Sequence, residues 1–101
     1  MAFRFEDLQV WQKAMALNEQ INQLTKAFPK DELFILVSPI KRASDSVVLN
    51  IAEGSTGQSK AVFKVFLGYS LRSATEVVSC LFIAKRRNYM NDDLFNELYT
   101  E

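Results

Sequence analysis

The chain has 101 residues and a mass of 11.6 kDa, which suits one domain with its own core and is too little for two. Basic and acidic residues balance at 12 each, so the totals exclude a strongly basic nucleic-acid-binding domain but leave the distribution of charge open. Only 3 Gly and 2 Pro interrupt the sequence, which disfavours a sandwich or barrel of many short strands.

The first predicted helix covers residues 6–28. Its apolar residues recur at alternating spacings of four and three, which is the pattern of a buried seam on one helix face. This seam consists of Val10, Ala14, Leu17, Ile21, Leu24 and Phe28. Pro29 is expected to end the helix at Phe28, because the residue before a proline is pushed out of the helical region.

The second predicted helix covers residues 38–53. Ser38 reads as its N-cap and Pro39 as its first helical residue, a combination typical of helix starts. Gly54 stands where a glycine with left-handed backbone often ends a helix. Gly54 to Gly57 also match the GXXG loop of KH domains, but that loop needs flanking strands, so a helix end followed by a turn is favoured.

The third predicted helix covers residues 60–87, with Ser59 as its N-cap. Between Ala61 and Ala84, 16 of 24 residues are apolar, more than one buried face of a surface helix requires. This excess predicts a central helix or one that meets another subunit. A short fourth helix, 92–101, completes the expected fold class, which is all-α, an antiparallel up-down four-helix bundle with short loops in one domain, 1–101.

An enzyme is the least favoured class. Without His, a serine or cysteine nucleophile lacks its usual base, and no spacing of carboxylates suggests a metal or cofactor site. The lone cysteine, Cys80, reads as a small buried hydrophobe, and Trp11 as a core or interface aromatic rather than a base-stacking one. We expect no cofactor and no small-molecule substrate. The lack of a signal-like or membrane-spanning apolar run favours a cytoplasmic protein.

The neutral total hides an uneven distribution of charge. Residues 58–90 contain six cations and one carboxylate, a net charge of +5, whereas residues 91–101 carry −4. Basic surface of this kind can bind phosphate backbones, although each residue alone is more often an ordinary solvated charge. The candidate nucleic-acid-binding residues are Lys41, Arg42, Lys60, Lys64, Arg72, Lys85, Arg86 and Arg87.

Several motifs resemble one family in order along nearly the whole chain. They are FEDLQVWQKA at 5–14, FPKDE at 28–32, KRA at 41–43, NIAEG at 50–54 and SK at 59–60. This pattern is similar to the four-helix-bundle proteins encoded in 23S ribosomal RNA intervening sequences. The chain departs from the family at Ile35, Pro39 and Val62, where glycine, glutamine and an acidic residue are usual.

The resemblance implies a pentameric helical bundle of largely unassigned function, related to a nucleic-acid-binding accessory protein of diversity-generating retroelements. Together with the basic segment, it favours a non-enzymatic homo-oligomer that binds RNA or a nucleoprotein partner. The alternative is a protein-interaction scaffold with no role in nucleic-acid binding.

Overall fold

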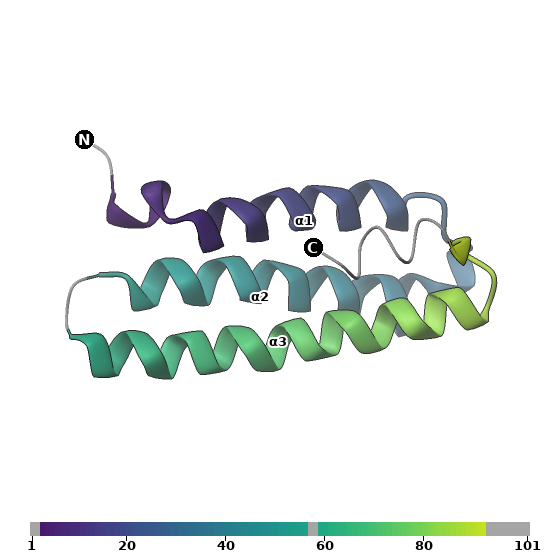
Figure 1. Cartoon of the computed structure of the whole chain (residues 1–101). Coiled ribbons are helices and arrows are strands. Elements are labelled where there is room, and N and C mark those ends of the chain that lie inside the picture. The colour runs from purple at the N-terminus through teal and green to yellow at the C-terminus, as the bar shows by residue number, and fades with distance from the viewer. Residues whose placement is uncertain (1–2, 57–58, 93–101) are drawn as a thin grey trace.

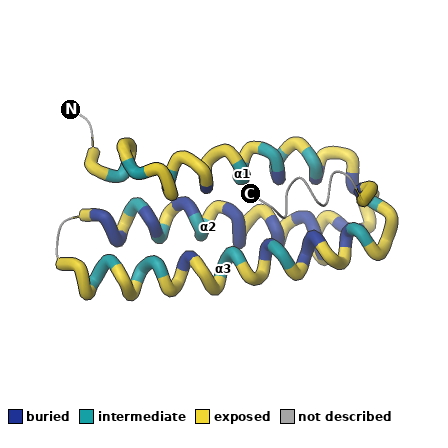
Figure 2. Tube along the Cα trace, in the orientation of Figure 1, coloured by how far each residue is buried: buried dark blue, intermediate teal, exposed yellow. Residues whose placement is uncertain are grey.

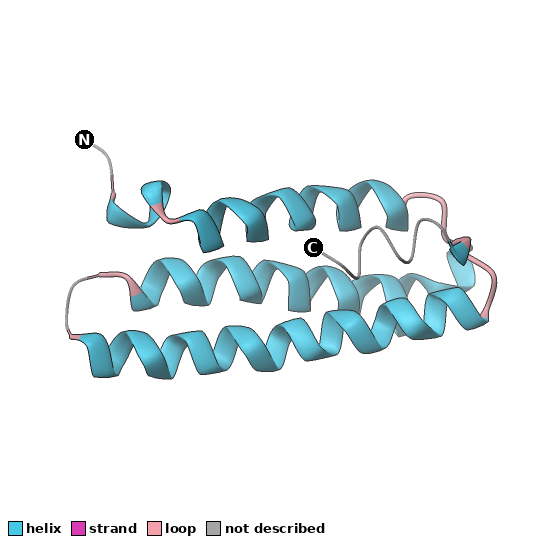
Figure 3. Cartoon of the chain, viewed as in Figure 1, coloured by secondary structure: helices cyan, strands magenta, loops and turns pink. Residues whose placement is uncertain are grey.

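The computed structural model describes residues 3–56 and 59–92, which form three α-helices and shorter helical turns (Figures 1 and 3). The α-helices are α1 (Gln9–Thr25), α2 (Ser38–Gly54) and α3 (Lys60–Arg86). Each helix runs antiparallel to the one before it in the chain, and α2 packs against both of the others (Figure 1). The described residues contain no strand, which confirms the all-α class. The predicted helix 92–101 lies outside them except for Asp92.

The first helix is shorter at both ends than the predicted span of 6–28. Arg4–Asp7 form a separate 3-10 turn, because Leu8 has extended backbone angles (φ −76°, ψ 124°) that interrupt the helix. At the other end, the Thr25 hydroxyl donates to the Ile21 carbonyl at 3.0 Å, and the chain then turns towards Pro29. Such a local side-chain bond competes with the helical backbone pattern. Pro29 therefore follows the helix end by four residues.

The second half of the connection from α1 to α2 is itself helical and continues into α2 without a break. A 3-10 turn, Lys30–Glu32, is followed by a π-helical turn, Leu33–Val37, whose last hydrogen bond joins the Ser38 amide to the Leu33 carbonyl. The predicted start of α2 at Ser38 is confirmed, but the prediction that the Ser38 side chain caps the helix is wrong. Val37 is already helical, so the Ser38 amide has a backbone partner and the Ser38 hydroxyl caps nothing.

Gly54 is the last residue of α2, but the prediction of a left-handed cap there is wrong. Its backbone does not have the positive φ of a left-handed cap. Instead, a Cβ atom at this position would lie 2.6 Å from Cβ of Phe66 and 3.0 Å from a ring carbon of Phe63. The glycine therefore allows α2 and α3 to approach closely, which is one of the uses of a residue without a side chain.

The third helix has the boundaries that the sequence predicts, to within one residue. The Ser59 hydroxyl accepts a hydrogen bond from the Val62 amide at 3.1 Å, which confirms the predicted N-cap. At the C-terminal end, Asn88 has a left-handed backbone (φ 64°), and the Tyr89 amide bonds back to the Ala84 carbonyl at 2.9 Å. This is a Schellman-type helix end with asparagine in place of glycine.

Buried residues recur along all three helices (Figure 2), and their apolar side chains form two clusters. The larger one joins all three helices and includes Ile21, Ile40 and Leu81, each 2% exposed or less. The smaller one joins Ala14 to Val48 and Ile51, and Trp11 packs on it, in agreement with a core aromatic. The predicted seam of α1 is confirmed from Ala14 to Phe28, but Val10 is 48% exposed and does not belong to it.

Candidate interaction surfaces

The long helix α3 exposes far more apolar surface than its own chain covers. Five large apolar side chains of this helix are between 41% and 69% exposed: Val65, Tyr69, Leu71, Phe82 and Ile83. The turn before α2 adds Phe34 (82%) and Ile35 (67%). A single exposed leucine is ordinary, but a series along one helix marks an interaction surface. This exposure agrees with the predicted apolar excess of α3.

Four of the predicted cations lie exposed along α3: Lys60, Lys64, Arg72 and Arg86. Lys60 and Arg86 are 26 residues apart, so the series extends about 39 Å along the helix. Lys41 and Arg42 are exposed on α2. The structure therefore spreads these six cations over two helices instead of collecting them in one pocket.

The remaining two predicted cations have partners within the chain. Lys85 is partly buried, and its Nζ lies 3.7 Å from a carboxylate oxygen of Asp92. Arg87 forms an ion pair with Glu32, whose carboxylate is buried. Because a buried carboxylate is costly without a cation, Arg87 stabilises the corner between the α1–α2 connection and the end of α3.

Tyr89 belongs to the same corner. Its ring packs on Phe28 with centroids 5.2 Å apart, and its phenol is hydrogen-bonded to Glu32. Desolvation, followed by the hydrogen bond and the negative charge of Glu32, raises the pKa of this phenol above its ordinary value of 10.0. The ring contact of Tyr89 and the ion pair of Glu32 with Arg87 make this corner a structural site.

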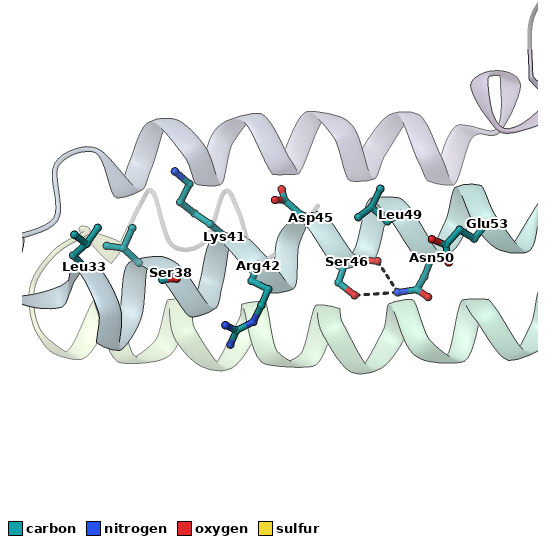
Figure 4. A pocket seen from close by; sticks show the side chains of 10 residues that line it. Leu33, Ser38, Lys41, Arg42, Asp45, Ser46, Leu49, Asn50 and Glu53 are labelled. Carbon is teal, nitrogen blue, oxygen red and sulfur yellow. Dashed lines mark hydrogen bonds between the residues drawn. The ribbon is translucent and has the colours of Figure 1, made fainter.

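A groove of about 630 Å³ follows the outer face of α2 (Figure 4). Leu33 lies at one end and Glu53 at the other (Figure 4). The side chains between them are mostly polar or charged, and Leu49 is an apolar exception among them. Leu49 is 57% exposed, and Arg42 points towards α3 in this view. The groove is open and contains both signs of charge, so it suits a macromolecular surface better than a small ligand.

Hydrogen bonds between polar side chains join α2 to its neighbours. The Ser73 hydroxyl of α3 donates to that of Ser46 at 2.9 Å, and Ser70 donates to the Val47 carbonyl at 3.0 Å. Asn50 donates to Ser46 within α2. Serine side chains therefore form the polar contacts between α2 and α3, whereas Arg42, Glu53 and Glu76 are exposed.

Sequence reasoning missed the most constrained polar residue, Glu32. Its place beside a second acid at a helix start favours solvent, yet it is 7% exposed whereas Asp31 is exposed. No local signal in the sequence marks Glu32 for burial, because the apolar residues that follow it, Leu33, Phe34 and Ile35, are themselves exposed. The sequence does not show that Arg87, 55 residues away, is its partner.

No helix within the described residues combines the length and the apolarity that crossing a membrane requires. In the same part of the chain, no three Cys, Asp or Glu side chains come close enough together to hold a metal ion.

A sequence model of the 23S rRNA-intervening sequence protein family matches residues 6–101. The chain belongs to this family. A comparison with curated proteins gives no match.

The family motifs of this 23S rRNA-intervening sequence protein serve mainly to build the fold. In the opening motif, Phe5 and Trp11 pack together with ring centroids 5.0 Å apart. In the NIAEG motif, Ile51 is buried and Gly54 allows the close approach of α3. The motifs therefore establish the architecture, and the surfaces described above must be read from this chain's own residues.

Proposed function

We propose that this protein is a non-enzymatic subunit of a homo-oligomeric helical bundle that binds RNA through exposed cations of α3. The observation that supports it is that α3 exposes five large apolar side chains and four cations along a single helix. Apolar exposure of this extent is typical of a surface covered by another subunit. On this proposal the subunits form the pentamer of four-helix bundles that the family resemblance implies.

Assembly explains how a neutral chain can bind a polyanion. Each subunit contributes the same cations, so a closed ring multiplies a modest local charge into a continuous basic rim. Binding of structured RNA should then weaken steeply with salt, because each neutralised phosphate contributes about −0.7 to −0.9 to the slope of log K against log salt. A nucleoprotein partner would be recognised through the same phosphates.

The test measures assembly by light scattering and RNA binding by fluorescence anisotropy at several salt concentrations. A triple variant, Lys60→Glu, Lys64→Glu and Arg86→Glu, should lose RNA binding but keep its helicity and its oligomer size. It leaves Arg87 unchanged, because reversing that charge would disturb Glu32. The matched control reverses three other exposed lysines, Lys13, Lys26 and Lys30, and should keep most of the affinity.

The alternative function is a protein-interaction scaffold without nucleic acid. The groove along α2, with both signs of charge and an exposed leucine, favours it as the second candidate. If the unmodified oligomer does not bind RNA, or binds it with an affinity that salt does not change, the scaffold function is supported over RNA binding. A monomer of 11.6 kDa at micromolar concentration would contradict both functions.

A further inference from the structure

Two exposed helix faces carry complementary sequences of charged and apolar residues. The face of α2 that lines the groove contains Ser38, Arg42, Asp45, Leu49 and Glu53, at spacings of four, three, four and four. The face of α3 contains Val65, Tyr69, Arg72, Glu76 and Ile83, at spacings of four, three, four and seven. Each set shares one side of its helix because these spacings follow the helical repeat. All ten residues are exposed.

The register between α2 and α3 within the chain gives the level of each residue along the helices. Ser46 lies beside Ser73, Val47 beside Ser70, and Gly54 beside Phe66. Because the two helices are antiparallel, each step up the sequence of α2 corresponds to a step down the sequence of α3. Arg42 lies at the level of Glu76, Asp45 at the level of Arg72, and Leu49 at the level of Tyr69.

A second copy of the chain preserves these levels when its symmetry axis is parallel to the helices. Any closed ring or twofold dimer of that kind places α2 of one copy at the same height as α3 of the next. Arg42 then meets Glu76, Asp45 meets Arg72, and the half-exposed Leu49 and Tyr69 meet each other. Charge and apolar surface are therefore complementary at three consecutive levels.

We infer that the groove face of α2 binds the outer face of α3 of a second copy, with Arg42–Glu76 and Asp45–Arg72 as intersubunit ion pairs. This inference rests on the homo-oligomer of the proposed function and identifies its contact surfaces. Within the described residues, none of these four charges forms an ion pair in its own chain, so all four are available to a neighbour. The Asp45 carboxylate does accept a hydrogen bond from Asn18 at 2.8 Å, which holds it in place on the face.

Other occupants of the groove match its charges less well. Residues 93–101 contain three carboxylates and no cation, so they would place like charges beside Asp45 and Glu53. An RNA backbone in the groove would meet Asp45 and Glu53, and repulsion between phosphates and carboxylates opposes that contact. Only a surface with both signs of charge in the reverse order satisfies the groove, and α3 of a second copy provides it.

The contact also separates the exposed cations by role. Arg42 of α2 and Arg72 of α3 lie within the subunit contact, which leaves Lys60, Lys64 and Arg86 of α3 for RNA, while Lys41 of α2 lines the same groove as Arg42. The RNA-binding test and the assembly test therefore use different residues, and each can fail without the other.

The experiment reverses one ion pair and measures assembly by sedimentation velocity over a range of concentrations. Arg42→Glu and Glu76→Arg should each raise the concentration for half-assembly by about tenfold or more, because attraction becomes repulsion at every contact. The double variant should return to within about threefold of the unmodified protein. Lys13→Glu and Glu19→Arg, which make the same charge changes on α1, serve as controls and should have little effect.

An equal mixture of the two single variants distinguishes contacts between copies from contacts within one chain. Where the two variants alternate, the glutamate introduced at position 42 meets the arginine introduced at position 76, and the native Arg42 meets the native Glu76. A ring of five keeps at least one contact between like variants, so assembly should recover in part on mixing. Recovery in the double variant without recovery in the mixture would place the pair within one chain and overturn the inference. Single variants that assemble like the unmodified protein would also overturn it, and the proposed oligomer would stand. A monomeric starting protein would overturn both.

Discussion

Replacing Ile21 by alanine should remove a large part of the stability of this domain. Ile21 is 1% exposed and lies in the cluster that joins α1, α2 and α3. The change deletes three carbon atoms, which at about 0.8 kcal/mol for each buried methylene is a transfer loss of roughly 2.4 kcal/mol. The cavity that remains adds a further loss at about 24 cal/mol per Å³, so we expect a total of about 2.5–4 kcal/mol.

The assay is thermal unfolding followed by circular dichroism at one protein concentration, because assembly would otherwise shift the midpoint. For a domain of this size, a loss of about 3 kcal/mol lowers Tm by roughly 12–24 °C. Ile35→Ala is the matched control, because the same side chain is 67% exposed there. Its expected effect is below about 1 kcal/mol. Equal losses at the two positions would refute the assignment of Ile21 to the buried face of α1.

Three further changes probe the close helix contact, the buried carboxylate and the thiol. Gly54→Ala should destabilise the protein by about 1–3 kcal/mol, because the added Cβ would lie 2.6 Å from Cβ of Phe66. Gly68→Ala should stabilise it by about 0.5–1 kcal/mol, because a Cβ there has nothing within 4 Å. Chemical denaturation should show these opposite signs. Arg87→Gln should lower the free energy of unfolding by about 1–3 kcal/mol and Glu32→Gln by less, because only the first leaves a buried carboxylate without its cation. A larger loss for Glu32→Gln in denaturant titrations would contradict this. Desolvation, and secondarily Glu76, raise the pKa of Cys80 above its ordinary value of 9.0, so its contribution to stability is complete below that pH and declines as pH rises through the shifted pKa. Cys80→Ala should therefore flatten the fall in stability above pH 9, and an unchanged slope would exclude the thiol as its source.

The helices were predictable from sequence where local signals agree with the periodicity. Ser59 and the basic end at Arg86 and Arg87 bracket one continuous helical pattern, and α3 follows it to within one residue. The seam of α1 was predictable only in part. Val10 lies in the first turn of α1 and is 48% exposed, and the neighbouring Trp11 packs on the core there instead.

The errors occurred where a residue's role depends on a distant partner. Gly54 follows an apolar helix and precedes Ser55 and Thr56, which is the usual setting of a left-handed cap, yet its role is set by Phe66 of α3. The same holds for Arg87, which in the sequence is one of several basic residues at a helix end and in the structure is the partner of Glu32. Periodicity describes one helix at a time and carries no information on which side chains meet across helices.

RNA binding and subunit assembly should be coupled, which yields a final prediction. A single subunit offers Lys60, Lys64 and Arg86 to phosphates, and three contacts limit the salt slope to about −2 to −3. An assembled ring repeats the set, and simultaneous contacts can raise affinity by about 10² or more. Arg42→Glu should therefore lose RNA affinity together with assembly although its three RNA-binding cations are intact, and the double variant with Glu76→Arg should recover both. Lys13→Glu, which changes the net charge equally, should alter neither. If Arg42→Glu dissociates the oligomer but binds RNA with unchanged affinity and salt slope, the basic rim is not multivalent and each subunit binds RNA alone.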